Sequence, residues 1–542
     1  MLNFIKSYPK ILKNEFKGYN AKKFSNDLMA GITVAAVALP LALAFGVSSG
    51  ATAAAGIVTA IFAGLVIGGL SGASYQISGP TGAMTAILVS LVAQYGMQGV
   101  FVASFIAGVL LLICGIFKLG GLVSYLPMPV ITGFTSGIAV IIALGQVNNL
   151  TGLKSEGLNT IETVSSYFTL PQTLDIPSLI VGVSVIVFMF IYPKKLSKYC
   201  PSSLIAIILS TLVCALCGIN VPSVGAIPKT LFLEERLNFG AIDFSQIGNF
   251  ISPAISIAAL GLIESLLCGS SAGRMKNEKM DADVELVAQG IGNMIIPVFG
   301  GVPATAAIAR TSVAIKSGAE TRLVSIIHAL VLLLSMFVLG DVMSMIPLSA
   351  LAGVLIVTAW RMNEWHSIKS IFGKKLKTPI AQFLITMVST VIFDLTIAIL
   401  IGVVFSAFMF IIKVSDMQIN VKTVESEKLD TVNDDVKGTV FVTLSGPLYF
   451  GTSTKIEKLM DHLDDHKHVI FDLSGVNVAD LSGIEAFKDK CEELMKSKCE
   501  VYIVGISLDV KKMFDRCGFI DKEENELYFE NGDLVFDFIA AK

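Results

Sequence analysis

Residues 74–85 read Ser74-Tyr-Gln-Ile-Ser-Gly-Pro-Thr-Gly-Ala-Met-Thr85 and interrupt an otherwise apolar part of the chain. Residues 299–308 read Phe299-Gly-Gly-Val-Pro-Ala-Thr-Ala-Ala-Ile308 and interrupt a second apolar part in the same way. Each reads as a short extended stretch that leads through glycine to a proline, Pro80 or Pro303. We expect each proline at the first position of a short helix, where its missing N–H is not needed.

The two interruptions belong to a longer pattern that occurs twice. Pro40 precedes Pro80 by 40 residues, and Glu264 precedes Pro303 by 39 residues. Proline-marked helix starts follow at similar distances, at Pro127 and at Pro347. Such agreement predicts an internal repeat, whereas a single proline kink is common in membrane helices and would indicate little.

The composition places this pattern in a membrane. Of 542 residues, 54% are hydrophobic and only 15% are charged, whereas a soluble domain carries roughly a quarter charged residues. Too few charges remain to cover a soluble surface of this size, so the excess apolar surface must face lipid. The net charge of -3 argues against nucleic acid as a partner.

Apolar segments long enough to be spans recur along the chain. Fourteen are expected, of which 80–95 and 303–316 are too short to span alone: 28–47, 52–70, 80–95, 98–117, 128–147, 175–193, 203–219, 249–270, 284–298, 303–316, 322–340, 346–360, 379–394 and 396–414. Seven is odd, so seven spans repeated once must lie in opposite orientations. We assign the repeats to residues 27–219 and 248–414.

Basic residues occupy every second connection, as the positive-inside rule requires. They are Lys118; Lys194, Lys195 and Lys198; Arg274, Lys276 and Lys279; Lys316 and Arg322; and Arg361, Lys369, Lys374, Lys375 and Lys377. The connections 150–173 and 220–247 are acidic by comparison and are expected outside. This pattern predicts a cell (inner) membrane protein whose N-terminal segment, residues 1–26, and C-terminus are both cytoplasmic.

Paired, interrupted helices in matching positions of two such halves point to a binding site near the middle of the membrane. Helix N-termini offer unpaired N–H groups and a partial positive charge, which favours an anion. Thr81 and Thr305 are expected to add hydroxyl donors. Glu264 lies well inside its apolar span, where an ionisable group is costly and usually functional. We interpret it as an ion-coupling group; the alternative is a structural partner for Arg310.

Arg310 itself has two readings, either attracting the anion or marking the cytoplasmic end of its helix. His328 is expected to be a packing residue whose nitrogens are satisfied. The sequence shows no Walker-type loop, metal-ligand cluster or nucleophile arrangement. We therefore expect no cofactor, no metal and no enzyme activity.

Several of these stretches resemble the SulP (sulfate permease) family of anion transporters, which is related to the animal solute-carrier anion exchangers. The matching motifs are Asp27-Leu-Met-Ala-Gly-Ile-Thr33 with Leu39-Pro40, Gln76-Ile-Ser-Gly-Pro-Thr81, Gly261-Leu-Ile-Glu-Ser-Leu-Leu-Cys268, Glu285-Leu-Val-Ala-Gln-Gly-Ile-Gly-Asn293, Phe299-Gly-Gly301 and Pro303-Ala-Thr-Ala-Ala-Ile-Ala-Arg-Thr311. The resemblance extends over essentially the whole chain.

The resemblance implies an all-α membrane domain of fourteen segments in two inverted repeats (7+7). In such proteins a core domain moves like an elevator against a gate domain, usually within a homodimer. By motif position, the substrate-binding residues would be Pro40, Leu41, Ala42, Phe45, Gly79, Pro80, Thr81, Pro303, Ala304, Thr305, Ala306 and Ala307. Glu264 and Cys268 would be the ion-coupling residues.

The motifs leave the transported anion open among sulfate, bicarbonate and C4-dicarboxylates. Sodium-coupled members carry a hydroxyl four residues after the acid, where this chain has Cys268, a poor sodium ligand. This departure favours proton-coupled symport. The alternatives are a sodium-coupled bicarbonate transporter, or an uncoupled anion channel or exchanger on the same fold.

The composition changes after Lys413, and residues 415–542 are predicted to form a cytoplasmic α/β domain behind the transport domain, residues 27–414. Expected strands are 438–444, 468–473 and 499–505, and expected helices are 483–497 and 508–516. Phe471-Asp-Leu-Ser-Gly475 and Asp480-Leu-Ser-Gly483 resemble a STAS domain. Ser482 is expected near a helix N-cap, either as a capping hydroxyl or as a regulatory phosphate acceptor.

Overall fold

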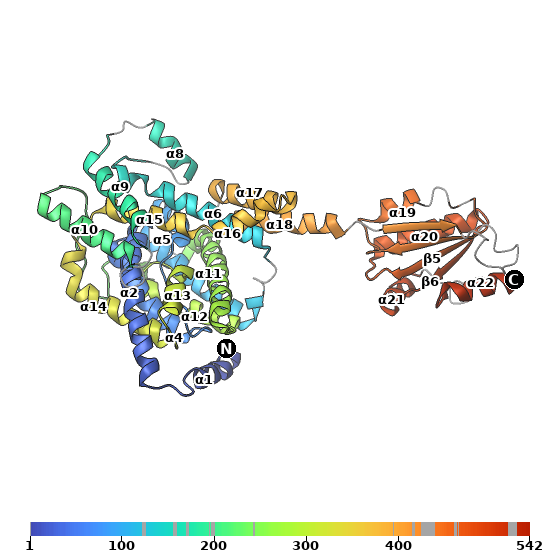
Figure 1. The fold of residues 1–542 in the computed structure, drawn as a ribbon, viewed down its shortest axis with the longest axis horizontal. Coiled ribbons are helices and arrows are strands. Elements are labelled where there is room, and N and C mark those ends of the chain that lie inside the picture. The colour runs from blue at the N-terminus through green and yellow to red at the C-terminus, as the bar shows by residue number, and fades with distance from the viewer. Residues whose placement is uncertain are drawn as a thin grey trace. The chain divides into compact units, whose positions relative to one another are not determined.

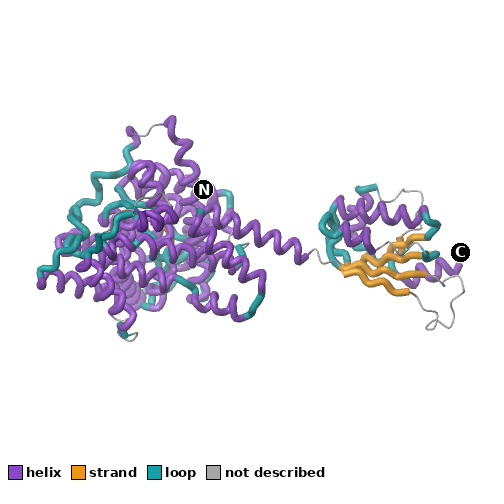
Figure 2. The backbone as a smooth tube through the Cα atoms, turned by 90° about the horizontal axis from the view of Figure 1, so that it is seen from above, coloured by secondary structure: helices purple, strands orange, loops and turns teal. Residues whose placement is uncertain are grey.

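The computed structural model describes residues 2–121, 126–155, 160–169, 173–193, 196, 201–241, 244–393, 395–414, 418–423, 439–459, 463, 465–518 and 528–541. These form two compact units, Met1–Val403 and Val404–Lys542. The first is built from helices, and the second contains a sheet (Figures 1 and 2). Three residues used above to assign sides of the membrane, Lys194, Lys195 and Lys198, lie outside the described residues.

The helical part begins with an N-terminal helix, α1, that precedes the spans. In chain order its helices are α1 (Leu2–Glu15), α2 (Ala21–Ser48), α3 (Ala53–Phe62), the π-helical η1 (Ala63–Ile67), α4 (Gly68–Leu70), α5 (Gly82–Ile116), α6 (Met128–Gly145), α7 (Val147–Thr151), α8 (Thr160–Thr169), α9 (Ile176–Ile191), α10 (Ser202–Cys217), α11 (Ile247–Lys276), α12 (Ala282–Ile295), α13 (Ile308–Lys316), α14 (Leu323–Met343), α15 (Leu348–Met362), α16 (Trp365–Gly373), α17 (Lys377–Ile392) and α18 (Leu395–Val414). Two short strands, β1 (Ser78–Gly79) and β2 (Thr305–Ala306), lie among them.

Each of the fourteen predicted spans overlaps helical structure, although span 52–70 comprises α3, η1 and α4, and span 303–316 is helical only from Ile308. Among the described residues, seven helices are long and apolar enough to cross a membrane, and five shorter apolar helices accompany them. The predicted spans 80–95 and 98–117 form a single helix, α5, with a sharp kink at Gly96. Gly96 has a φ of 65°, a left-handed conformation that glycine adopts without strain.

Helix α14 shows why this unit belongs in lipid. Leu330, Leu334 and Val338 recur at every fourth residue and are 50%, 63% and 64% exposed. Leu332 and Met336, on the opposite side of the helix, are completely buried. A helix that is apolar on both its packed and its exposed side fits a bilayer, not water.

Hydrogen bonds and an ion pair join the N-terminal segment to the connection before α14. Asp27 accepts hydrogen bonds from the backbone N–H groups of Glu320 and Thr321, at 2.7 and 3.0 Å. Glu15 forms a buried ion pair with Arg322, with 2.7 Å between Oε2 and Nη2. Ten predicted spans lie between these two regions, and an even number returns the chain to the same side of the domain.

Small residues let α5 and α12 pack closely, which fixes α12 beside the two short strands. A Cβ built on Gly290 would lie 2.6 Å from the backbone nitrogen of Leu112 and 2.8 Å from the carbonyl oxygen of Gly108. Only glycine fits at such a contact, as at many helix crossings in membranes.

The C-terminal unit has a five-stranded sheet in the order β3-β4-β5-β6-β7. The strands are β3 (Gln418–Thr423), β4 (Thr439–Ser445), β5 (His468–Gly475), β6 (Glu500–Val504) and β7 (Tyr528–Phe529), and the helices are α19 (Ser453–Leu459), α20 (Leu481–Lys496), α21 (Leu508–Arg516) and α22 (Gly532–Ala541). Strand β3 is antiparallel to β4, and the other neighbours are parallel. Helices cover both faces of the sheet (Figures 1 and 2).

The predicted elements of this unit agree with the structure to within two residues, but the cap of α20 was predicted at the wrong residue. The N-cap is Asp480, whose Oδ1 accepts a hydrogen bond of 2.8 Å from the N–H of Gly483. Ser482 is the second residue of the helix and is exposed. A carboxylate two residues earlier therefore takes the role that we had expected for its hydroxyl.

We expect Gly290→Ala to lower the free energy of unfolding by about 1–3 kcal/mol, because α5 and α12 must move apart to admit a methyl group. Gly248→Ala in α11 is the matched control, since nothing lies within 4 Å of the position of its Cβ. Thermal unfolding of the purified protein in detergent measures both variants. Equal melting temperatures for the two would show that the helices do not meet at Gly290.

Candidate functional site

The two interruptions in the sequence pair with each other inside the helical unit. Strands β1 and β2 run antiparallel, with Ser78 opposite Ala306 and Gly79 opposite Thr305. The N–H of Ala307 donates a further hydrogen bond of 3.0 Å to the carbonyl oxygen of Ile77. Helix α5 and the short helix α13 begin within three residues of the ends of these strands, so their N-termini are held close together, as the repeat predicted.

The prolines do not occupy the helix positions that we expected. Thr81 is the N-cap of α5, and its hydroxyl accepts a hydrogen bond from the N–H of Met84 at 3.4 Å. Pro80 therefore lies before the cap, and Pro303 lies four residues before Ala307, the N-cap of α13. Both prolines belong to the extended stretches, where a residue without an N–H leaves no donor unpaired.

Four of the predicted binding residues, Pro40, Leu41, Ala42 and Phe45, lie in α2 and are buried. The ring of Phe45 contacts the start of α5, because a Cβ on Gly82 would lie 3.1 Å from its Cε1 atom. Pro40 interrupts the hydrogen-bond pattern of α2, since proline cannot donate to the carbonyl group four residues earlier.

Glu264 projects from the middle of α11 to the N-terminus of α5. The hydroxyl of Thr81 donates a hydrogen bond of 3.0 Å to Oε2 of Glu264. The same hydroxyl caps α5, so the carboxylate is linked through one atom to the helix N-terminus. Glu264 is half-buried.

Arg310 of α13 lies beside Gly79 and Pro80 and is only 1% exposed. Its Nη2 donates a hydrogen bond of 2.8 Å to the carbonyl oxygen of Pro80, while Nη1 has no partner within the part of the chain that the structure describes. Gly79 must be glycine here, because a Cβ would lie 2.4 Å from Nη1. Across the described residues Arg310 and Glu264 form no ion pair, and burial rules out Arg310 as an exposed marker of a helix end.

One polar face of α12 holds both strands in place. Asn293 donates from Nδ2 to the carbonyl oxygen of Ala304 and accepts at Oδ1 from the N–H of Ala304, at 2.9 and 2.8 Å. Gln289 donates from Nε2 to Ser78 Oγ at 3.1 Å and to Glu285 Oε1 at 2.9 Å. All three side chains are buried. In the sequence these residues stand out only as part of a family motif, although their spacing of four residues indicates a shared helix face.

The donors at α13 are largely used within the protein. The hydroxyls of Thr305 and Ser265 lie 2.9 Å apart, and the N–H of Ala306 donates to Ser265 Oγ at 3.4 Å. Ala304 and Ala307 also have partners for their N–H groups, as described above. Thr305 is therefore turned away from any ligand, and the free N–H groups of α13 are those of its first turn, beginning at Ile308.

Cys268 lies one helical turn beyond Glu264 and is completely buried. Its Sγ donates to Thr311 Oγ1 at 3.4 Å, and the same oxygen accepts a hydrogen bond of 3.0 Å from the N–H of Ile77. The thiol thus contributes to the packing behind β1. Among the described residues no cluster of three or more His, Cys, Asp or Glu is arranged to hold a metal ion.

His328 differs from the expectation of a satisfied packing residue. Its side chain in α14 is completely buried, and neither ring nitrogen has a hydrogen-bond partner among the residues described. The imidazole packs near η1, where a Cβ on Gly64 would lie 3.3 Å from Nδ1. The hydropathy of the sequence predicted that His328 is buried, but it could not show that the ring nitrogens lack hydrogen-bond partners in the described part of the chain.

Comparison with known proteins agrees with this architecture. The sulfate permease family matches residues 24–389, and the STAS domain family matches residues 430–531. YvdB, a candidate sulfate transporter of Bacillus subtilis (strain 168), is 33% identical over 96% of this chain and 98% of its own. The bicarbonate transporter BicA of a Picosynechococcus species is 28% identical over 91% of both chains.

Two solved structures share the fold. Murine solute carrier 26 family member A9, an anion transporter solved in its inward-facing state, superposes with a TM-score of 0.86 at 18% identity over 100% of this chain and 95% of its own. The transmembrane domain of a cyanobacterial bicarbonate transporter BicA gives a TM-score of 0.63 at 27% identity, over 72% of this chain and 98% of its own. This chain therefore belongs to the sulfate permease family of multi-pass membrane transporters, carries a C-terminal STAS domain, and is not an enzyme.

Proposed function

We propose that this protein is a secondary active transporter that carries a small anion, namely sulfate, bicarbonate or a C4-dicarboxylate, together with a proton. The observation that carries the proposal is the hydrogen bond between Thr81 and Glu264 at the N-terminus of α5. It joins an ionisable group to a helix end that attracts anions, inside a membrane domain.

The charges around the strand pair explain how protonation and anion binding are coupled. With Glu264 ionised, its negative charge balances that of the buried Arg310, and the carboxylate repels an anion at the start of α5. Protonation removes that repulsion and leaves the positive charge of Arg310 beside the free N–H groups of α5 and α13. Proton and anion therefore favour each other's binding, which is what thermodynamic coupling between two sites requires.

The names of the relatives support the substrate class. YvdB is described as a candidate sulfate transporter and BicA as a bicarbonate transporter. The similarity to BicA also favours one alternative, a sodium-coupled bicarbonate carrier. The position of Cys268 argues against it, because the thiol is bound to Thr311 and sulfur is a poor ligand for sodium. An uncoupled channel or exchanger would not need Glu264.

The wider arrangement follows from the family and from the repeats. We assign residues 27–414 to the transport domain, with inverted repeats 27–219 and 248–414 that form a core and a gate, and residues 415–542 to a cytoplasmic STAS domain. The protein would act in the cell membrane as a homodimer with both termini inside. Substrate contacts would come from Pro40–Phe45, Gly79–Thr81 and Pro303–Ala307. The last group would line the site, and the free N–H groups in the first turn of α13 would donate the hydrogen bonds.

Glu264→Gln is expected to abolish the dependence of uptake on a proton gradient, because glutamine keeps a hydrogen-bond partner for Thr81 but cannot take up a proton. The measurement is uptake of labelled sulfate, bicarbonate, succinate and fumarate into proteoliposomes under imposed proton or sodium gradients. Asp341→Asn is the matched control, since Asp341 is exposed and pairs with Lys229. Wild-type pH dependence in Glu264→Gln would refute the coupling role.

Arg310→Gln is expected to raise the apparent KM for the anion roughly 30-fold, the equivalent of about 2 kcal/mol for a unit charge nearby at an effective dielectric constant of about 20. Folding stability should change little, because the buried guanidinium leaves Nη1 unpaired. Concentration-dependent uptake and thermal melting test the two statements. Arg274→Gln, an exposed arginine of α11, is the control. An unchanged KM would exclude Arg310 from anion binding.

Ser482 is proposed as a regulatory position, because a phosphate in the first turn of α20 would interact favourably with the helix N-terminus. Ser482→Asp should then change the rate of uptake by the full-length protein, whereas Ser482→Ala should behave as the wild type does in its unphosphorylated form. Identical uptake rates for both variants would remove the regulatory assignment.

A further inference from the structure

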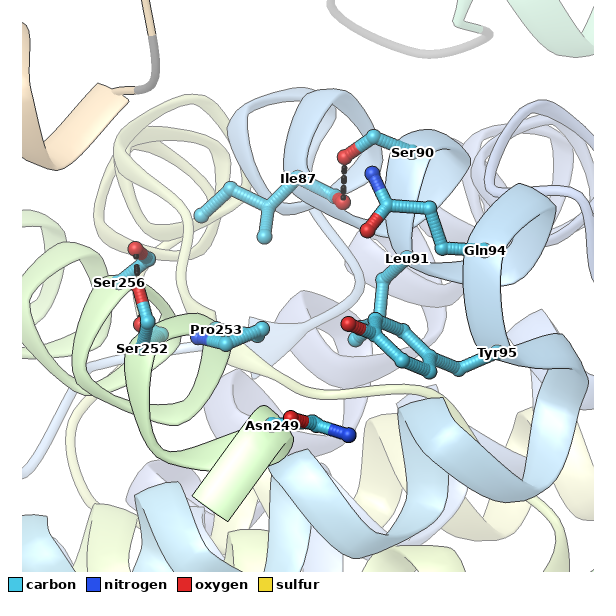
Figure 3. A pocket seen from close by; sticks show the side chains of 9 residues that line it. All are labelled: Ile87, Ser90, Leu91, Gln94, Tyr95, Asn249, Ser252, Pro253 and Ser256. Atoms are coloured by element: carbon cyan, nitrogen blue, oxygen red, sulfur yellow. Dashed lines mark hydrogen bonds between the residues drawn. The ribbon is translucent and has the colours of Figure 1, made fainter. Parts of the chain in front are cut away.

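A polar cavity of about 220 Å³ lies between α5 and α11, on the two helices that carry Thr81 and Glu264 (Figure 3). It is lined by Ile87, Ser90, Leu91, Gln94, Tyr95, Asn249, Ser252, Pro253 and Ser256. Six of these nine side chains are polar and none is charged. One water needs on the order of 10–15 Å³ of such volume, so the cavity has room for several waters or a small hydrated anion.

The spare donors in the cavity are amide groups. The single O–H protons of Ser90 and Ser256 are donated to carbonyl oxygens of their own helices, at 3.0 and 3.2 Å (Figure 3). Within the described part of the chain, the side-chain amides of Gln94 and Asn249 have no hydrogen-bond partner at all. Unpaired amides on spanning helices are costly against lipid, so this face has to meet water or a polar ligand.

The cavity and Glu264 share one face of α11. Asn249, Pro253, Ser256, Leu260 and Glu264 follow one another at intervals of three or four residues, which places them on the same side of a helix. Ser256 precedes Glu264 by eight residues, or about 12 Å along the helix axis. The cavity and the carboxylate of Glu264 therefore lie on the same face of α11, about two helical turns apart.

The same order appears on α5, where Thr81, Met84, Ile87, Leu91 and Gln94 share a face. Between the cavity and the Thr81–Glu264 hydrogen bond lies one apolar residue on each helix. Met84 and Leu260 are each only 1% exposed. A single apolar layer thus separates a polar cavity from the candidate coupling site.

The location of the cavity indicates that it opens toward one side of the membrane. It lies at the end of α11 that follows the long connection 218–246. Gln98, just beyond the kink in α5, donates a hydrogen bond of 2.7 Å to the carbonyl oxygen of Arg236 in that connection. The repeat and charge pattern place this connection outside the cell.

We propose that the cavity is an outer binding site in which a small oxyanion is held by the uncharged amide donors of Gln94 and Asn249 before it passes Met84 and Leu260 to the site at Glu264. This inference rests on the proposed anion transport. Neutral donors bind an oxyanion without the strong attraction of a fixed cation, so the anion can leave again toward the deeper site, as conduction through successive sites requires.

The test uses Ser256→Cys in the full-length protein, in a background in which Cys217, an exposed native cysteine, is replaced by serine. Proteoliposomes of determined protein orientation are treated with a membrane-impermeant thiol reagent on one side at a time. Labelling is measured in sodium sulfate, sodium bicarbonate or sodium gluconate at equal ionic strength. Ile255→Cys, an exposed neighbour that does not line the cavity, is the control.

We expect the reagent to label Ser256→Cys from the outer side only. Labelling should be slower in sulfate or bicarbonate than in gluconate, and this protection should persist when Arg310→Gln has weakened the deeper site. Adding Asn249→Leu should raise the half-protecting anion concentration about fivefold, the effect of one lost hydrogen bond. The proposal would be overturned if Ser256→Cys is not labelled from the outer side, or if anions do not slow its labelling. It would also be overturned if the protection disappears with Arg310→Gln, or if Ile255→Cys is protected equally. Wild-type liposomes that take up none of sulfate, bicarbonate, succinate and fumarate would instead refute the proposed function.

Discussion

A backbone that leaves the helical conformation inside a bilayer must find hydrogen-bond partners within the protein, because lipid offers none. Strands β1 and β2 meet this requirement by pairing with each other, and Asn293 binds both backbone groups of Ala304 beside them. The close crossing of Gly108 and Gly290 brings α12 near enough for these bonds to form. The position of both helix N-termini, and so of any bound anion, depends on this small strand pair.

The strand pair also brings two opposite charges to adjacent residues. The carbonyl group of Pro80 accepts from Arg310, and the hydroxyl of Thr81 donates to Glu264. Both charged side chains come from α11 and α13, whereas Pro80 and Thr81 lie at the start of α5. Protonation of Glu264 therefore changes the electrostatic potential at the start of α5, next to a fixed positive charge. No large element has to move for this change to occur.

Much of this arrangement could be predicted from the sequence, because hydrophobic length and repeated proline signals depend on local residues. The spans, the proximity of the two interruptions and the position of Glu264 well inside its helix were predicted in this way, whereas the pairing of β1 with β2 was not. The position of Pro303 four residues before the α13 cap was not, since it depends on how far the extended strand continues. Some features depend on contacts between distant helices, which spacing along one helix cannot reveal. Among the described residues these are the unpaired Nη1 of Arg310, the hydrogen bond between Thr305 and Ser265, and the His328 ring without partners.

The central claim is that one proton at Glu264 accompanies one anion at the helix N-termini. Calorimetric titration of the purified protein with the transported anion, in buffers of different ionisation enthalpy, counts the protons taken up on binding. Near the pH at which Glu264 is mostly ionised, the account predicts uptake of about one proton per anion, because linked binding must shift protonation. Anion binding with no proton uptake would contradict it.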